Sequence, residues 1–207
     1  MRHMAKKTKK SISVDVKIAN FATSFDESDK GCVLLIGSML ENALGHLHET
    51  SILANVGTTD IFKKLKDNRG PLSDFYSRIN LAFAFRLISK DLFEALHIFR
   101  KLRNEAAHCD FNFSLRDPGV RKHLEQLEKY YKELNEDDVL QFEEILAKVE
   151  VENIMKFAFL VRCHHILKEL LGHVLEQLNR DFKGSKGRSE FNAEKQKDKN
   201  RQKLVKN

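Results

Sequence analysis

The sequence predicts an all-α protein, a single multi-helix bundle domain with disordered basic N- and C-terminal tails. Three observations support this fold class. Nine Gly and two Pro among 207 residues are few for a turn-rich β protein. Apolar residues recur at helical spacing in several long segments, and no segment shows a convincing strand pattern. The length suits one domain with its own core and is short for two.

Charge divides the chain into three parts. Residues 1–10 carry five basic residues and no acid, and residues 183–207 carry nine basic residues and three acids. Since the whole chain has 36 basic and 30 acidic residues, residues 11–182 have a net charge of −5. We expect a flexible basic leader at 1–12, a helical domain at 13–182 and a disordered basic tail at the end. The acidic body argues against broad phosphate binding, so we assign any non-specific nucleic-acid contact to the basic ends.

Cysteine usage and hydropathy predict the cellular setting. The three cysteines are spread out and form no C-x-x-C pair, which indicates a reduced, cytoplasmic environment. No apolar segment follows the basic N-terminal residues, as a secretory signal would require. The longest nearly continuous apolar run, CVLLIGSML, is too short to cross a bilayer. We therefore expect a cytoplasmic protein without membrane contact.

The first strong element is the segment DESDKGCVLLIGSMLENALGHLHETSI. At about 100° per residue its apolar side chains fall in one arc, which predicts an amphipathic helix. Gly37, Glu41 and Gly45 form a separate stripe at four-residue spacing. Small residues on either side of an acid would let the backbone of a neighbouring helix approach closely, with the carboxylate located between the two helices. The alternative is that Glu41 lies on a solvated face.

The segment KLKDNRGPLSDF interrupts the helical pattern. Residues 68–71 predict a turn, and Ser73 is the expected N-cap of the following helix. Ser89 is expected to cap the next helix, which includes FRKLRNEAAHCD, with Asp91 in its first turn. The helix between these two caps presents its apolar residues at helical spacing: Leu72, Phe75, Ile79, Ala82 and Phe83.

The C-terminal half predicts three further helices. Pro118 is placed in the first turn of one, and a short helix near 137–148 leads to a last long helix. The inward residues of the first of these helices are Leu124, Leu127, Tyr131 and Leu134. The buried stripe of the last comprises Ile154, Phe157, Val161, Leu167, Leu171, Val174, Leu175 and Leu178.

The helix through residues 92–108 has two faces. With Arg100 at zero and about 100° per residue, an apolar arc runs from about 160° to about 340°. Arg103 falls inside that arc, near about 300°, so it needs a carboxylate or several carbonyl groups opposite it. Glu41 is the candidate partner. The apolar arc holds Ile98, Leu102, Ala95, Ala106, Phe99, Leu92, Leu96 and Ala107, and a polar stripe holds His97, Arg100, Asn104 and His108.

The segments DNRGPLSDFYSRINLAFAFRLIS and ALHIFRKLRNEAAH resemble the signature of the mannitol operon repressor family, a group of all-helical bacterial proteins. The resemblance is densest over residues 67–108. It departs from the family pattern at Phe85-Arg86, where a Leu-Gly type pair is expected. The motif residues are Arg69, Gly70, Leu72, Phe75, Arg100, Arg103, Asn104 and His108, to which Glu41 is added as a structural partner.

The family resemblance implies a non-enzymatic, transcription-linked regulator with a repressor function. No helix-turn-helix with a basic recognition helix is recognisable in the sequence. We therefore expect it to act mainly through contacts with a protein partner, as a homodimer. A purely structural adaptor is a further alternative.

The shorter motif Arg103-Asn104…His108 also resembles the R-x(4–6)-H motif of HEPN domains, many of which are metal-independent ribonucleases. This implies an alternative function in a toxin or defence system. His108 would act as general base or acid on a 2′-OH, Arg103 would stabilise the phosphorane and Asn104 would orient the histidine. On an ideal helix Arg103 and His108 lie about 140° apart, whereas Asn104 and His108 share a face.

Other candidate sites have little support. His46-x-His48 and Cys163-His164-His165 diverge on a helix and lack the spacing of a zinc site, so we expect no metal. Cys109 is expected to be a buried, inert thiol. The chain has no G-x-S-x-G, P-loop or G-x-G-x-x-G motif, and we expect no cofactor.

Overall fold

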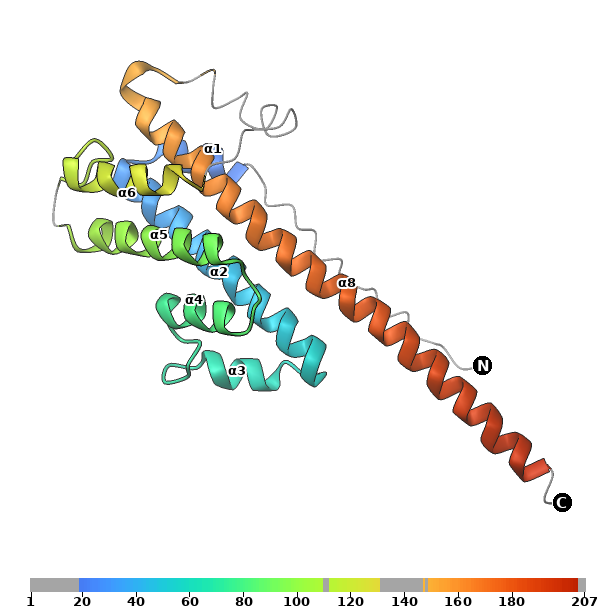
Figure 1. Ribbon diagram of the computed structural model, residues 1–207. Helices are drawn as coiled ribbons and strands as arrows, with labels where there is room; N and C mark the ends of the chain where they lie inside the picture. Colours follow the sequence, from blue (N-terminus) through green and yellow to red (C-terminus); the bar gives the residue numbers. More distant parts are fainter. Residues whose placement is uncertain (1–18, 110–111, 131–146, 148, 205–207) are drawn as a thin grey trace, which may run out of the picture.

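The computed structural model describes residues 19–109, 112–130, 147 and 149–204 (Figure 1). Within these residues every regular element is helical, which confirms the predicted all-α bundle. The elements are α1 (Ala19–Asp26), α2 (Asp29–Val56), α3 (Asp60–Lys66), α4 (Phe75–Ala84), α5 (Lys90–His108), α6 (Pro118–Glu128), the 3-10 turn η1 (Val151–Asn153) and α8 (Ile154–Leu204).

Some sequence predictions lie outside the described residues. These are the basic leader at 1–12, the short helix near 137–148, and the inward positions of Tyr131 and Leu134. In the described part of the chain, no helix combines the length and apolar character needed to cross a membrane.

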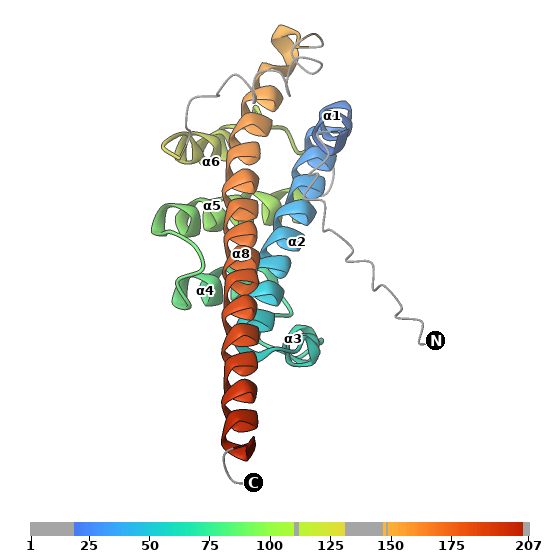
Figure 2. The same cartoon turned by 90° about the vertical axis from the view of Figure 1, so that its right-hand side faces the viewer.

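α2 and α8 lie side by side and make the most extensive helix contact in the molecule (Figures 1 and 2). The helices α3, α4, α5 and α6 form a stack beside this pair. α5 is packed between α4 and α6 and also contacts α2 and α8. Among the described residues of α5, Lys101, Glu105, Ala107 and His108 remain exposed in its second half.

The apolar core lies between α2, α5 and α8. The rings of Phe99 and Phe159 are fully buried there and stack with their centroids 6.0 Å apart. Ala107, at the edge of the predicted arc on α5, is exposed and Ile98 is only half-buried. The rest of that arc is buried as predicted: Leu92, Ala95, Leu96, Phe99, Leu102 and Ala106.

The buried face of α8 differs in part from the predicted stripe. Val161, Leu167 and Val174 are buried, but Ile154 is 55% exposed and Leu175 is 44% exposed. The buried face of α8 also includes a set that the sequence did not single out: Phe159, Leu160, Cys163, Ile166 and Leu170.

The backbone of α8 continues as a helix to Leu204, through most of the segment for which disorder was predicted. In both views this end extends past the bundle (Figures 1 and 2). Isolated helical segments are marginal in water without tertiary packing. Disorder of residues 183–207 in solution therefore stays a prediction.

Two of the three predicted helix starts are confirmed. The Ser89 hydroxyl accepts a hydrogen bond from the Leu92 amide at 3.1 Å, and Pro118 is the first residue of α6. For α4 the predicted cap, Ser73, is wrong. The Asp74 carboxylate accepts from the amide and the hydroxyl of Ser77, at 2.9 and 2.7 Å. An ionised carboxylate can accept both donors at once, which makes it the stronger cap.

The turn predicted at residues 68–71 is present and depends on Gly70. Its amide donates to the Asp67 carbonyl at 2.6 Å, and the Leu72 amide donates to the Leu65 carbonyl at 2.8 Å. A Cβ on Gly70 would lie 2.1 Å from the Leu65 oxygen, so a larger residue does not fit. The turn places the Leu72 side chain in the core.

Candidate functional site

Side chains of α4 and α5 approach the Gly37-Glu41-Gly45 stripe of α2. A Cβ on Gly37 would lie 3.0 Å from Arg103 Cγ, and one on Gly45 would lie 3.8 Å from Arg78 Nη1. Glu41 Oε1 is 3.3 Å from Arg78 Nη1, and its Oε2 is 4.0 Å from Arg103 Nη2. One carboxylate therefore lies between two guanidinium groups, one from each neighbouring helix.

Arg103 occupies the predicted place opposite Glu41, but it is not buried. Its side chain is 38% exposed and reaches the carboxylate only at 4.0 Å. The expectation of a buried guanidinium at this position is therefore wrong. The aliphatic stem crosses Gly37, and the charged end continues towards solvent, as long cationic side chains commonly do.

Arg78, which the sequence analysis did not single out, is buried, unlike the other arginines that the structure describes. Its Nε donates to the Leu72 carbonyl at 2.7 Å, and its Nη1 donates to the Glu41 carbonyl at 3.3 Å. The ring of His48 hydrogen-bonds to the Arg78 carbonyl at 2.9 Å, and burial lowers the pKa of His48. The sequence did indicate a buried position for Arg78, because Phe75, Arg78, Ile79 and Ala82 follow the spacing of an apolar helix face.

The R-G-x-L-x-x-F residues surround Arg78. Gly70 permits the turn, the Leu72 carbonyl accepts from Arg78, and Phe75 is buried in the core. Arg69 is exposed and takes no part in these contacts. This half of the signature builds the junction between α3, α4 and α2.

The polar stripe of α5 meets aromatic residues of α4. The Arg100 guanidinium lies over the Tyr76 ring at 5.0 Å, and the ring of His97 makes edge contacts with Tyr76 at 5.5 Å and with Phe93 at 4.5 Å. Phe83 stacks on Phe93 at 4.4 Å. We refer to Tyr76, Phe83, Phe93, His97 and Arg100 as the aromatic strip. Burial and the charges of Arg100 and Lys101 lower the pKa of His97.

The aromatic strip is partly open to solvent. Tyr76 is 52% exposed and Phe83 is 39% exposed. Phe83, which follows the helical spacing of the apolar residues of α4, is thus not part of the buried face that Phe75, Ile79 and Ala82 form. The ring lies near the end of α4, where it covers Phe93 at the edge of the bundle rather than entering the core.

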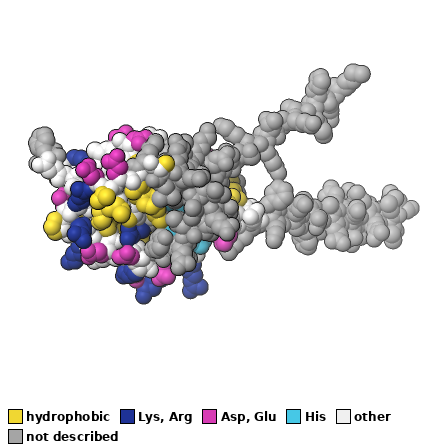
Figure 3. Space-filling model, turned by 90° about the horizontal axis from the view of Figure 1, so that it is seen from above, with side chains coloured by type: hydrophobic (Ala, Val, Ile, Leu, Met, Phe, Trp, Pro, Cys, Tyr) yellow, Lys and Arg dark blue, Asp and Glu magenta, His cyan; other side chains and the backbone are white. Residues whose placement is uncertain are grey.

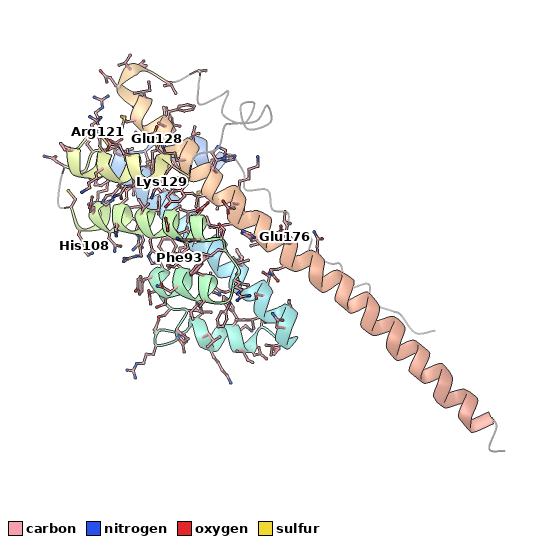
Figure 4. All side chains as sticks on the ribbon, viewed as in Figure 1. Phe93, His108, Arg121, Glu128, Lys129 and Glu176 are labelled. Carbon is pink, nitrogen blue, oxygen red and sulfur yellow. The ribbon has the colours of Figure 1, made fainter. Side chains whose placement is uncertain are left out.

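Asn104 and His108 complete the polar stripe towards the other end of α5. Asn104 is half-buried, and His108 is exposed at the last residue of the helix, far from Phe93 (Figure 4). In the described part of the chain neither side chain has a hydrogen bond or ion pair. Arg103 is directed towards α2 instead. The structure thus brings Arg103 to Glu41 and leaves His108 apart from both.

The remaining candidate residues have separate environments. His46 is exposed and lies 3.7 Å from Glu49, whereas His48 is buried against Arg78. Cys163 is buried, and burial raises the pKa of its thiol. Cys109 is half-buried rather than buried as predicted, because it follows the end of α5. Among the described residues, no group of three His, Cys, Asp or Glu side chains could hold a metal ion.

The end of the bundle seen from above shows a mixed surface. Lys and Arg side chains lie among Asp and Glu side chains around an apolar area (Figure 3). The described residues on this face therefore show no large region of a single charge.

Comparison with known proteins identifies a distant structural relative. No family model matches the sequence, and no curated protein matches it. A chain from the X-ray structure of the MtlR-HPr complex from Escherichia coli has the same fold, with a TM-score of 0.53 and 13% sequence identity. The match covers 73% of this chain and 98% of the other. The fold is distantly MtlR-like. At this identity the similarity establishes the fold alone.

Proposed function

We propose that this protein is a non-enzymatic, transcription-linked regulator of the mannitol operon repressor type that acts by binding another protein. The fold carries the proposal. It matches 98% of a chain from the MtlR-HPr complex, which is itself an assembly of proteins. The sequence signature over residues 67–108 supports the same assignment independently of the fold comparison.

The geometry around Arg103 favours a structural role over a catalytic one. A ribonuclease of the HEPN type would need this guanidinium and the His108 imidazole to act on the same phosphodiester. Here the Arg103 stem lies over Gly37 and its charge faces Glu41, while His108 is exposed at the end of α5. The arginine contributes to the contact between α5 and α2.

We propose a homodimer that reaches transcription through its protein partner. No helix-turn-helix motif with a basic recognition helix is recognisable in the sequence, and the body of the chain carries a net charge of −5 over residues 11–182. Direct, sequence-specific reading of an operator is poorly supported by such a surface. Contact with a protein that itself acts on transcription is the simpler route.

A HEPN-type ribonuclease is the second candidate, because Asn104 and His108 lack side-chain partners within the described residues. Labelled structured and single-stranded RNA should be incubated with the purified protein and EDTA, beside a folded His108→Ala variant. We expect no cleavage by either. Cleavage by the wild type that is lost in His108→Ala would overturn the regulator proposal.

The regulator proposal has its own positive test. The tagged protein should be purified from its native cells, and transcript levels should be compared with and without the protein. We expect a defined protein to co-purify and a defined set of transcripts to change. Stable co-purification of a partner without any change in transcript levels would contradict the regulator proposal and indicate that the protein is a structural adaptor.

A further inference from the structure

The aromatic strip forms an unbroken series of contacts across two helices. From Arg100 the contacts pass to Tyr76 on α4, back to His97 and Phe93 on α5, and then to Phe83 on α4. The centroid distances along it are between 4.4 and 5.5 Å. Because each ring is held by the next, the strip is an ordered surface.

The strip leaves large apolar side chains in contact with solvent. Tyr76 and Phe83 are 52% and 39% exposed, and Phe85, in the turn that ends α4, is 66% exposed. Contiguous exposed apolar patches on soluble proteins commonly mark interaction sites. Tyr, Phe and Arg are enriched at the centres of protein interfaces, whereas Lys, Glu and Asp are depleted. The strip contains rings, one histidine and one arginine, and no acid.

The charge of Arg100 lacks a carboxylate partner among the described residues. Its guanidinium rests on the Tyr76 ring, and its Nε is buried without a hydrogen bond. Two acids of the same helix have other partners: Glu94 accepts from the Tyr130 hydroxyl at 2.5 Å and lies 3.8 Å from Lys90, and Glu105 is paired with His123 at 2.9 Å. With Lys101 also exposed on α5, the strip offers positive charge. Carboxylates on a partner would complement it.

We propose that the aromatic strip is the surface that binds the partner protein, and that this partner presents an apolar side chain flanked by carboxylates. The inference rests on the proposed function, for which it names the surface and the chemistry of the partner. A nucleic acid fits less well, because phosphate binding relies on several clustered Lys and Arg residues. The strip itself holds one arginine, and its rings are already packed against each other.

The test uses two fluorescent amphipathic helical peptides with the same Leu and Phe face, one flanked by Glu and the other by Lys. Fluorescence anisotropy measures their binding to the full-length protein. We expect the Glu peptide to bind about tenfold more tightly than the Lys peptide, because opposite charges meet across the contact. Arg100→Gln and Tyr76→Ser should each weaken its binding by about tenfold.

Val151→Ser is the matched control, since Val151 is 87% exposed and lies in η1, outside the strip. It should bind the Glu peptide as the wild type does. Phe83→Ser gives a second strip variant at a 39% exposed ring, should Tyr76→Ser fail to fold. Equal binding of the two peptides, or unchanged binding by folded strip variants, would overturn the proposal. Strip-dependent binding of labelled single-stranded RNA, tighter than that of the Glu peptide, would also overturn it.

Failure of this inference can be separated from failure of the proposed function. If the co-purifying protein is kept by Arg100→Gln and Tyr76→Ser, the strip is not its binding surface, although the regulator proposal stands. If no protein co-purifies with the wild type but the strip-dependent preference for the Glu peptide is measured, the regulator proposal fails and the strip remains a binding surface.

Discussion

Arg78 and Arg103 both approach Glu41, yet their surroundings differ. Arg78 is 7% exposed and has two backbone carbonyl acceptors in addition to the carboxylate. Arg103 is 38% exposed, and its guanidinium is 4.0 Å from the same carboxylate. Buried charges lose much more than exposed ones when a partner is removed, because water cannot replace that partner. The two residues should therefore contribute unequally to stability.

Replacement of each arginine by alanine tests this difference. We expect Arg78→Ala to lower the free energy of unfolding by about 3 kcal/mol or more, since Glu41 and the Leu72 carbonyl both lose a partner. Arg103→Ala should cost at most about 1 kcal/mol. Urea unfolding followed by circular dichroism measures both, with Lys63→Ala at an exposed ion pair as the control. Equal losses at the two arginines would contradict this assignment.

His48 links the same junction to pH. Burial lowers its pKa below the ordinary value of 6.5, so the unfolded chain takes up a proton at a higher pH than the folded protein does. The stabilisation that the neutral His48 gives to the folded protein is fully present above pH 6.5. It is lost as the pH falls from there towards the pKa of His48 in the folded protein. We expect His48→Gln to reduce the loss of Tm between pH 7.5 and 5.5 relative to the wild type. An unchanged pH dependence would show that His48 is not the group responsible.

Among the helices, α4 ends in an unusual way. Arg86 has a φ of 55°, the left-handed region that favours glycine. Its amide donates to the Phe83 carbonyl and the Leu87 amide donates to the Ala82 carbonyl, at 2.9 and 2.8 Å. This is the hydrogen-bond pattern of a Schellman motif, whose left-handed position is usually glycine. The departure from the family signature at Phe85-Arg86 thus falls at a position where the backbone itself favours glycine.

Arg86→Gly should relieve this strain. We expect a gain of up to about 1 kcal/mol in the free energy of unfolding, because glycine adopts this conformation without a steric penalty. Gly57, with a φ of 79° at the end of α2, provides the reverse change. Gly57→Ala should lose about 1 kcal/mol. Differential scanning calorimetry compares the stabilities of the variants. A loss of stability in Arg86→Gly would show that the backbone at Arg86 is not strained.

The long elements could be predicted from the sequence, and the contacts between them only in part. α2 and α5 were predictable because 28 and 19 residues carry a clear helical period. α1 and α3, with eight and seven residues, are too short for such a signal. The glycines around Glu41 predicted a close approach correctly. The aromatic strip was not predictable, because it depends on how α4 lies against α5.

At the scale of the whole molecule, charge is separated between the body and the ends. Residues 11–182 carry −5, whereas residues 1–10 and 183–207 carry +5 and +6. Among the residues whose burial the structure describes, the apolar core lies between Phe25 and Val174. Removal of the ends should therefore leave the core intact while changing the sign of the net charge.

A fragment of residues 13–182 tests the role of the ends. We expect the full chain to bind RNA weakly and without sequence preference, with an affinity that falls steeply with salt, because counterion release drives such binding. The fragment should show no such binding at the same salt concentration and should keep its Tm within a few degrees. Filter binding between 50 and 200 mM NaCl measures the RNA affinity of the full chain and of the fragment, and a thermal melt followed by circular dichroism measures Tm. Over this salt range about six phosphate contacts would cost about a thousandfold in affinity. Equal binding by the fragment would move the contact into the folded body.

The stripe on α2 also constrains how this molecule can evolve. Gly37, Glu41 and Gly45 align because each is about one helical turn from the next. Insertion of a single residue between them would rotate everything beyond it by about 100°. Arg78 and Arg103 could then no longer reach the same carboxylate. In sequences that descend from this one, insertions and deletions should accumulate in the connections between helices. The spacing of residues along α2 should stay unchanged.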